Sequence, residues 1–402
     1  MPFLFCTQRG LPSPSSGADK PAETGRHWGN QGTGAFVNFV KNIWYVAAWS
    51  NEVLAGQLFH RTYLDEPILI FRKADGTAVA LGDRCPHRFA PLHMGKLVGE
   101  TVECPYHGLT FDCTGACASN PHGKGAVPRA AQTRSYPLVE RHNLLWIWMG
   151  NASLADPLTI PDFSFMTDTT HWTTVHGYLN LQANYEIVVD NLTDLSHAPF
   201  VHDGLLESRD VCKGEFKTVR TGERVETLNW CPGIAPPPFF NHLKGTAALL
   251  DPAGLIDHWQ DMRYEPPGCM ITYYGITPRG RTRAEGIDTY NPNFVTPETA
   301  TTTHYFWAGS RNFDLNDSVV NEMFRNGYEY AFEHQDRPIL EGQQKMLGTA
   351  DLMSMGPVML INDGGSVHAR RVMKKRLDAE RAALDRTPEG LDVQDEPDAV
   401  RS

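Results

Sequence analysis

Two short segments, each of which pairs a cysteine with a histidine, constrain this chain more than any other feature. The first reads Cys85-Pro-His87 and the second, after sixteen intervening residues, reads Cys104-Pro-Tyr-His107. Thiolates and imidazoles presented together on short loops are typical ligands of zinc or of an iron–sulfur cluster. The proline after each cysteine restricts the loop backbone, and Gly108 allows a close approach of the chain. The sequence therefore predicts a metal centre held by two loops.

The way the ligands are divided between the loops distinguishes the two kinds of metal centre. Zinc sites usually draw on C-x-x-C and H-x₃₋₅-H pairs, whereas each loop here supplies one cysteine and one histidine. This division suits a Rieske [2Fe–2S] cluster, in which two thiolates bind one iron and two imidazoles bind the other. Neutral imidazoles make such a cluster easier to reduce, with an expected potential of about −150 to +300 mV. A structural zinc site is the alternative.

A second group of metal-binding residue types follows in the segment 184–202. Asp190, Asp194 and His197 are spaced so that a helix would carry them on one face. Pro199 discourages helix continuation, so we expect His202 to return to the same centre from the next turn. Two imidazoles and a carboxylate fit a 2-His-1-carboxylate Fe(II) site, which leaves positions open for O₂. The alternative is a helix with a polar, solvated face.

The carboxylate that completes this site is not fixed by spacing. A helical stretch predicted at about 318–347 offers Glu333, Asp336 and Glu341. All three lie in the same part of the predicted helix, so the sequence pattern leaves the choice open.

The predicted fold class is α+β. Short strands and Gly/Pro turns fill the first part, including a hairpin of 68–71 and 78–81 around a turn at 74–76. A mixed region with two helical stretches, about 184–198 and 318–347, follows. We divide the chain into a disordered leader at 1–37, a β-rich cluster domain at 38–156, a catalytic domain at 157–375 and a charged tail at 376–402.

Composition and missing motifs exclude several classes of function. The net charge is −11, which argues against binding to nucleic acid or to an anionic membrane. The longest apolar run, 43–49, is far too short to span a bilayer. No secretory signal is recognisable, so we expect a cytoplasmic protein whose cysteines stay reduced or bind metal. Neither GxGxxG nor a P-loop occurs, so the chain shows no nicotinamide or flavin site of its own.

Together these segments resemble the Rieske non-haem iron oxygenases, specifically the oxygenase components near vanillate O-demethylase and dicamba O-demethylase. The resemblance rests on the motifs CPHRFAPL at 85–92, CPYHGLTFD at 104–112, DNLTDLSHAPFVH at 190–202 and HYFWAGSRNF at 304–313. It implies a Rieske domain followed by a helix-grip catalytic domain. It also implies a homotrimeric ring in which the cluster of one subunit faces the iron of its neighbour.

The resemblance assigns roles to individual residues. It places the [2Fe–2S] cluster on Cys85, His87, Cys104 and His107, and the mononuclear Fe(II) on His197, His202 and Asp336. Asp194 matches the carboxylate that links the two centres across subunits, and we assign Asn191 to catalysis as well. By position in the family, Thr272, Tyr274 and Asn293 lie near the iron pocket.

The function that this resemblance implies is O₂-dependent N- or O-dealkylation, or hydroxylation, of an aromatic compound. Electrons would come from NAD(P)H through a separate reductase and a ferredoxin. Ring cis-dihydroxylation and a purely electron-transferring Rieske protein are the alternatives. The segments 271–276 and 290–295 contain no Lys or Arg, so we expect a neutral substrate, although Arg281, Arg283 or His258 could supply a cation.

Overall fold

The computed structural model describes residues 39–348 and 351–384. The predicted leader at 1–37 and the last residues of the predicted tail lie outside these ranges. No helix within the described residues combines the length and the apolar character that a membrane crossing requires.

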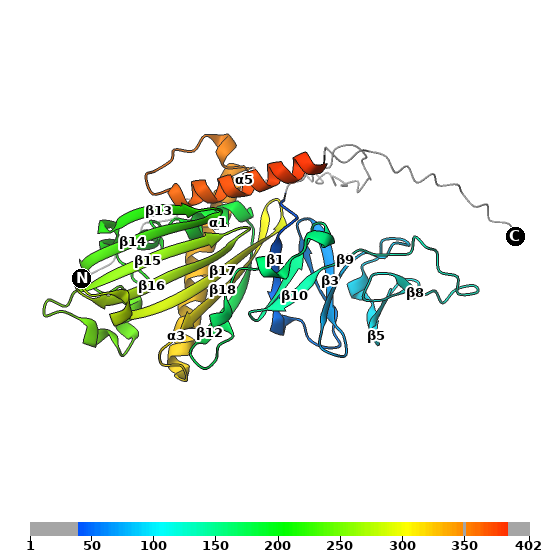
Figure 1. Cartoon of the computed structure of the whole chain (residues 1–402), viewed down its shortest axis with the longest axis horizontal. Coiled ribbons are helices and arrows are strands. Elements are labelled where there is room, and N and C mark those ends of the chain that lie inside the picture. The colour runs from blue at the N-terminus through cyan, green and yellow to red at the C-terminus, as the bar shows by residue number, and fades with distance from the viewer. Residues whose placement is uncertain (1–38, 349–350, 385–402) are drawn as a thin grey trace, which may run out of the picture. The chain divides into compact units, whose positions relative to one another are not determined.

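The first part of the chain folds into three small antiparallel sheets (Figure 1). The first contains β1 (Trp44–Trp49), β11 (Leu144–Trp148) and β10 (Leu138–Arg141). The second contains β2 (Phe59–Tyr63), β3 (Glu66–Arg72), β4 (Ala78–Gly82) and β9 (Ser135–Tyr136). The third contains β5 (Lys96–Val98), β6 (Thr101–Glu103), β7 (Thr110–Phe111) and β8 (Cys117–Ser119). The predicted hairpin is confirmed as β3 and β4, with Gly76 at φ 87° in the turn.

The second part of the chain is built on one seven-stranded antiparallel sheet. Its strands are β12 (Thr173–Leu181), β18 (Thr302–Arg311), β17 (Ile287–Thr299), β16 (Cys269–Pro278), β15 (Ile256–Glu265), β14 (Arg224–Ile234) and β13 (Glu215–Thr221), in spatial order. Because side chains alternate along a strand, residues two apart face the same side of this sheet. The predicted α+β class, with a β-rich domain followed by a domain of sheet and helices, is confirmed.

Helices flank this large sheet. They are α1 (Tyr185–Thr193), α2 (Ala198–Val201), α3 (Ser318–Tyr330), α4 (Arg337–Leu347) and α5 (Gly364–Leu384). A π-helical turn, Ala331–Asp336, joins α3 to α4, so the predicted helical stretch at 318–347 is present but carries one irregular turn. Helix α5 packs against α1 and beside β13 and β14 (Figure 1).

The predicted helix at 184–198 is broken, so Asp190, Asp194 and His197 do not share one helix face, contrary to the sequence prediction. Helix α1 ends at Thr193, and Asp194 adopts an extended conformation with φ −98° and ψ 93°. The Asp194 carboxylate accepts a hydrogen bond from the backbone N–H of Ser196 at 2.9 Å. Such local bonds compete with the helix and favour a turn. Asp190 points elsewhere and forms an ion pair with Arg370 at 2.6 Å.

Residues 376–384, which the sequence assigns to a charged tail, are the last turns of helix α5. The Glu380 carboxylate accepts hydrogen bonds from the backbone N–H groups of Lys41 and Asn42, both at 2.8 Å. This contact ties the end of the helix to the start of the β-rich part. At least one charged side chain of this segment, Glu380, therefore binds the helix to the β-rich part.

The β-rich part and the large sheet share an aromatic core. Its buried aromatic members are Trp44, Trp49, Trp146, Trp148, Phe163, Phe294 and Phe306. Backbone hydrogen bonds run from Leu64 to Pro297 at 3.0 Å and from Asp65 to Glu298 at 2.9 Å. The strand β17 that lines the catalytic cavity thus also anchors the cluster-bearing part.

Candidate metal centres and active site

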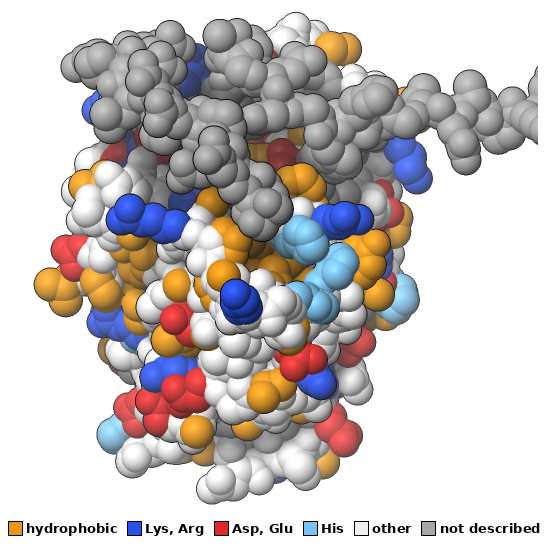
Figure 2. Space-filling model, turned by 90° about the vertical axis from the view of Figure 1, so that its right-hand side faces the viewer, with side chains coloured by type: hydrophobic (Ala, Val, Ile, Leu, Met, Phe, Trp, Pro, Cys, Tyr) orange, Lys and Arg blue, Asp and Glu red, His pale blue; other side chains and the backbone are white. Residues whose placement is uncertain are grey.

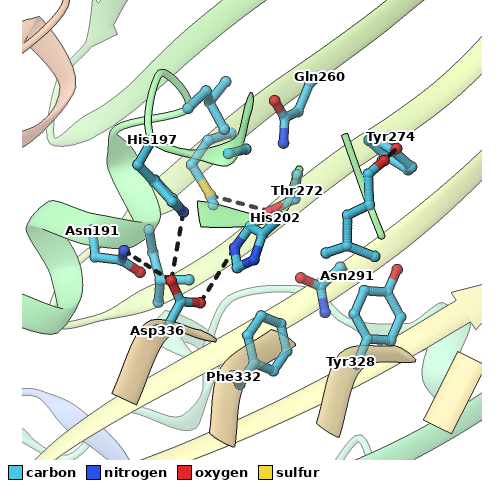
Figure 3. Close-up of a pocket in the computed structure, with 15 residues that line it drawn as sticks. Asn191, His197, His202, Gln260, Thr272, Tyr274, Asn291, Tyr328, Phe332 and Asp336 are labelled. Carbon is cyan, nitrogen blue, oxygen red and sulfur yellow. Dashed lines mark hydrogen bonds and ion pairs between the residues drawn. The ribbon is translucent and has the colours of Figure 1, made fainter. Parts of the chain in front are cut away.

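Two imidazoles and one carboxylate meet on the inner side of the large sheet (Figure 3). The potential ligand atoms of His197, His202 and Asp336 all lie within 4.8 Å of one another. The Asp336 carboxylate is 3.4 Å from His202 Nε2 and 3.8 Å from His197 Nε2. This donor set matches a mononuclear non-haem iron(II) site, because three protein ligands on one side leave positions open on the other.

Local backbone structure places these three side chains. His197 and His202 flank helix α2, so one short helix separates them. Asp336 ends the π-helical turn, and irregular turns of this kind are frequent at functional sites because they re-aim a side chain. The competing carboxylates of Glu333 and Glu341 both bind Arg337 instead. Of the three carboxylates that the sequence left open, the structure brings only Asp336 to the two histidines.

Further polar groups orient this triad. Nδ1 of His202 lies 2.9 Å from Gln335 Oε1, and Nδ1 of His197 lies 2.5 Å from the carbonyl oxygen of Asp194. When Nδ1–H donates to such an oxygen, Nε2 carries no proton and is free to bind a metal. Hydrogen-bond partners of metal-binding histidines usually have this role. Asn191 donates its amide N–H to Asp336 at 3.3 Å.

The charge of Asp336 also acts on its neighbour. Burial disfavours a charged His202, but the hydrogen bond and the charge of Asp336 outweigh burial and raise the His202 pKa. The site therefore favours a positive charge beside Asp336. A metal dication in this position would meet the same requirement.

The Asp194 carboxylate does not touch either histidine within the chain. It accepts hydrogen bonds from Ser196 N–H at 2.9 Å and from the Asn362 amide at 3.4 Å. Only the backbone carbonyl of Asp194 contacts His197. The residue thus sits at the rim of the triad with its carboxylate turned toward the segment before α5.

The two Cys/His loops have the same backbone design. Cys85 N–H donates to the Ala90 carbonyl at 2.9 Å, and Cys104 N–H donates to the Leu109 carbonyl at 2.8 Å. Each cysteine carbonyl in turn accepts from the residue four positions later, which is Phe89 in one loop and Gly108 in the other. Both of these residues have positive φ, 60° and 70°. The sequence pointed to Gly108 but missed Phe89, because phenylalanine gives no signal for a left-handed backbone.

Of the four side chains in these loops, the two cysteines are buried and the two histidines are more exposed. Cys85 and Cys104 are each only 2% exposed, whereas His87 is exposed and its ring centroid lies 4.5 Å from that of His107. Burial raises the pKa of the Cys85 thiol to about 11, so a thiolate here requires a bound cation. The donor set fits a Rieske cluster, which two buried thiolates and two more exposed imidazoles would hold.

The surface around these loops is rich in histidine and apolar side chains (Figure 2). Phe89, Met94 and Tyr106 are each more than half exposed. His122 extends the histidine group, with Nε2 2.8 Å from the His107 carbonyl. Exposed apolar groups gathered at one place are typical of a protein interface.

A small cavity of about 60 Å³ opens onto the triad. Its lining residues are Asn191, Leu192, Leu195, His197, Ala198, His202, Leu206, Gln260, Met262, Thr272, Tyr274, Asn291, Tyr328, Phe332 and Asp336 (Figure 3). The sequence predicted Thr272 and Tyr274 near the pocket, and both line it.

Asn293, the third residue predicted near the pocket, is buried and does not line the cavity. Its amide donates to Asn291 Oδ1 at 3.1 Å, and its carbonyl accepts from Tyr305 at 2.7 Å. Asn291 faces the cavity in its place. The two asparagines share one face of β17, so alternation alone could not separate them; pairing of Asn291 with Thr272 across the sheet brings Asn291 to the cavity.

No lysine or arginine lines the cavity among the residues that the structure describes. Arg283 binds Asp261 at 2.6 Å, and Arg281 lies beside Glu285 at 3.7 Å. His258 is fully buried behind the wall, 3.2 Å from a carboxylate oxygen of Glu207. Arg281, Arg283 and His258, which the sequence left as possible sources of a cation, therefore do not line the cavity.

A β-rich domain with paired Cys/His loops, joined to a large antiparallel sheet with a His-His-Asp triad, defines a Rieske-type non-haem iron oxygenase. Comparison with known families agrees. Residues 43–137 match the Rieske [2Fe-2S] domain, and residues 181–379 match the vanillate O-demethylase oxygenase C-terminal domain. The chain belongs to the vanillate O-demethylase family of Rieske oxygenase components.

The chain aligns with several relatives over nearly the whole length of each relative. The chain is 36% identical over 340 residues to the oxygenase component of dicamba O-demethylase from Stenotrophomonas maltophilia, covering 84% of this chain and 98% of the relative. It is 34% identical over 343 residues to the oxygenase component of chloroacetanilide N-alkylformylase from Rhizorhabdus wittichii, with coverage of 85% and 97%. The crystal structure of dicamba monooxygenase bound to dicamba matches with a TM-score of 0.79 and 35% identity, over 86% of this chain and 99% of that one.

These findings establish the class of enzyme. The protein is a non-haem iron oxygenase of the monooxygenase and demethylase type, and it is the oxygenase component of a multicomponent system. Its cofactors are a Rieske [2Fe–2S] cluster and a mononuclear iron, with O₂ as co-substrate. Separate redox proteins supply its electrons.

Proposed function

We propose that this protein is a terminal oxygenase that removes an N- or O-alkyl group from an aromatic compound. NAD(P)H supplies the electrons through a reductase and a ferredoxin. The observation that carries the proposal is the cavity of aromatic, aliphatic and uncharged polar side chains that opens onto His197, His202 and Asp336. The names of relatives that act on methoxy and N-alkyl aromatics support the same reaction type.

The residues divide into two metal-holding sets in this proposal. Cys85, His87, Cys104 and His107 hold the cluster, and His197, His202 and Asp336 hold the iron. Together the two centres supply single electrons and the activation of O₂. The domains are residues 38–156 for the cluster and 157–375 for catalysis.

The chain's own side chains orient these ligands and enclose the substrate. Gln335 and the Asp194 carbonyl hold Nδ1 of His202 and His197, which keeps each Nε2 available for the metal. Asn191 donates to Asp336 and holds its carboxylate in the triad. Apolar lining residues such as Leu192 and Phe332 keep water away from the reacting carbon.

The reaction balances for an aryl methyl ether. One O₂, two electrons and two protons are consumed. One oxygen atom is added to the methyl carbon, which leaves as formaldehyde while the ring keeps a hydroxyl group. The other oxygen atom leaves as water.

We further propose that the protein works as a homotrimer in which the cluster of one subunit lies beside the iron of the next. The exposed His87 and the apolar Phe89, Met94 and Tyr106 around it favour burial in an interface. Asp194, at the rim of the triad, is the carboxylate that would connect the two centres. Sedimentation or light scattering of the purified holoenzyme tests the assembly.

Turnover with defined redox partners tests the reaction. The holoenzyme, a ferredoxin, a reductase and NADH are incubated with aryl methyl ethers and N-alkyl anilides, and formaldehyde, O₂ uptake and NADH oxidation are measured. We expect equal amounts of aldehyde formed and O₂ consumed. A cis-diol without aldehyde would favour ring dihydroxylation, and no O₂-dependent product from any aromatic would favour pure electron transfer.

A further inference from the structure

One turn of the chain closes on the backbone of the metal ligand His202. The carbonyl oxygen of this residue accepts hydrogen bonds from three backbone N–H groups, those of Leu205 and Leu206 at 3.1 Å and that of Glu207 at 3.2 Å. Because three donors of the turn 203–207 meet at one acceptor, a movement of the turn also moves the backbone of His202. Whatever holds this turn therefore helps to place the ligand.

The side chain of Glu207 connects this turn to the large sheet. Its Oε1 lies 3.2 Å from Nε2 of His258, a residue of strand β15, and both side chains are fully buried. Nδ1 of His258 lies 2.8 Å from the Gly275 carbonyl oxygen on strand β16. The imidazole thus joins the carboxylate to two paired strands that also carry residues of the cavity wall.

The contacts of His258 show that this pair shares a proton. The Gly275 carbonyl can only accept a hydrogen bond, so Nδ1 of His258 carries a hydrogen. Nε2 and the Glu207 carboxylate would both be acceptors if neither were protonated, so one further proton lies between them. Either position of this proton gives a directed hydrogen bond between the turn and the sheet.

Stability alone does not explain a polar pair in this place. The ring of Phe240 lies 6.2 Å from that of His258, and Ile276 is the cross-strand partner of His258, so the surroundings are apolar. The second carboxylate oxygen of Glu207 is buried and has no hydrogen-bond partner among the residues that the structure describes. Apolar side chains can often replace a buried acid–base pair without loss of stability. The pair therefore points to a role that depends on the direction of its hydrogen bond.

A second hydrogen bond holds the same turn from the cavity wall. The Tyr274 hydroxyl donates to the Leu206 carbonyl, and Tyr274 lines the cavity (Figure 3). The rings of Tyr274 and His258 are in contact, with their centroids 5.1 Å apart. Gln335 holds the imidazole of His202 at Nδ1. The ligand is thus held at its backbone from the sheet and at its ring from the π-helical turn.

We infer that Glu207 is a positioning residue of the iron site, whose hydrogen bond to His258 holds the turn 203–207 and, through it, keeps His202 in place for the metal. The inference rests on the proposed function, since it adds a residue to the iron site of that proposal. Glu207 does not line the cavity, so it acts through His202 and not by contact with a substrate.

Two substitutions at one position separate the hydrogen bond from the size of the side chain. Glu207→Gln keeps the length of the side chain, and its amide N–H can donate to Nε2 of His258. Glu207→Met has a similar size but forms no strong hydrogen bond, so the turn loses its connection to β15. Thr296→Val is the matched control, because it also removes one buried hydrogen bond, which runs from the Thr296 hydroxyl to the Val46 carbonyl at 2.7 Å.

Two measurements on the holoenzyme with an oxidised cluster test the inference apart from turnover. Chelator competition gives the affinity for the mononuclear iron, and electron paramagnetic resonance of the nitric oxide adduct of the ferrous site reports the ligand geometry. We expect Glu207→Met to bind iron about threefold to tenfold more weakly and to show a second or broadened nitrosyl signal. Glu207→Gln and Thr296→Val should resemble the wild type, and every variant should keep about two acid-labile sulfides per chain.

Several outcomes overturn the inference. A folded Glu207→Met with the iron affinity and the nitrosyl signal of the wild type does so, and so does an equal change in Glu207→Met and Thr296→Val. If Glu207→Met does not fold, Glu207→Gln combined with His258→Asn removes the same hydrogen bond, while the asparagine amide can still donate to the Gly275 carbonyl. A wild-type nitrosyl signal in that double variant also overturns the inference.

The same measurements separate this inference from the proposed reaction. A wild type that binds no iron at the triad refutes both. A wild type that binds iron but releases no aldehyde from any aromatic refutes dealkylation, whereas a changed nitrosyl signal in Glu207→Met then still supports the positioning role. Normal aldehyde formation together with an unchanged signal in Glu207→Met leaves dealkylation standing and refutes the positioning role.

Discussion

The two metal sites differ in how far apart along the chain their donor residues lie. We place all four cluster donors within residues 85–107, whereas the triad joins residues 197 and 202 to residue 336. The cluster loops are shaped by hydrogen bonds within each loop, such as Phe89 N–H to Cys85 at 2.8 Å. The triad depends on a short helix, a π-helical turn and side chains from separate elements.

This difference matches what each site must do. The cluster site buries its cysteines and exposes His87, which suits exchange of electrons with another protein. The triad site encloses its reacting groups, with His202 and Asp336 each 4% exposed. A local, exposed site can be built by two loops, but an enclosed site needs the packing of the whole domain.

The largest expected effect is loss of one site without the other. Asp336→Ala removes the only carboxylate of the triad, so we expect loss of the mononuclear iron and of all dealkylation. The cluster loops are untouched, so iron should fall from about three to about two per chain while about two acid-labile sulfides and the visible spectrum remain. Iron and sulfide analysis measures this.

Glu333→Ala is the matched control for Asp336→Ala, because Glu333 lies on the same π-helical turn but binds Arg337. It should keep its iron. If Glu333→Ala loses the mononuclear iron and Asp336→Ala retains it, the assignment of the third ligand is wrong.

Asp194→Asn should separate electron transfer from metal binding. An asparagine carbonyl can still accept the Ser196 N–H that Asp194 accepts at 2.9 Å, so the turn and both metals should remain. The carboxylate that we place between the two centres is lost, so we expect turnover to fall about 10- to 100-fold. A single-turnover rate equal to that of the wild type would refute the connecting role.

Gln335→Met should weaken the triad alone. It removes the partner 2.9 Å from His202 Nδ1, which orients the imidazole. We expect the affinity for the mononuclear iron to fall about tenfold, with the cluster unchanged. Chelator competition followed by iron analysis measures this. Gln343→Met, at a half-buried position of α4, is the control and should bind iron like the wild type.

The smallest effects should come from the two left-handed residues of the cluster loops. Gly108→Ala places a methyl group 3.2 Å from Pro121 at φ 70°, so we expect a loss of about 1–2 kcal/mol in stability. Phe89→Gly relieves strain at φ 60° but makes the unfolded chain more flexible, so we expect a change within about 0.5 kcal/mol. Thermal unfolding followed by cluster absorbance tests both. If Phe89→Gly lost as much stability as Gly108→Ala, the expectation that the left-handed backbone strains Phe89 would be wrong.

The cluster donors could be predicted from sequence because they are close together in the chain. Short loops bring neighbouring residues together whatever the rest of the fold does, so the pairing of one cysteine with one histidine in each loop was already informative. The same reasoning failed at 184–198. It assumed one continuous helix, whereas the Asp194 carboxylate binds Ser196 N–H and ends that helix.

The sequence by itself indicated the α+β order of the chain and the type of each metal centre, and it predicted the histidines that we assign to each. Tertiary structure decided the rest: which of Glu333, Asp336 and Glu341 lies beside the two histidines, and that Asn291 and not Asn293 faces the cavity. Spacing along a chain sets which residues can share a turn or a strand face. Contacts between distant segments set which of those residues meet, and these depend on how helices and sheet pack against one another.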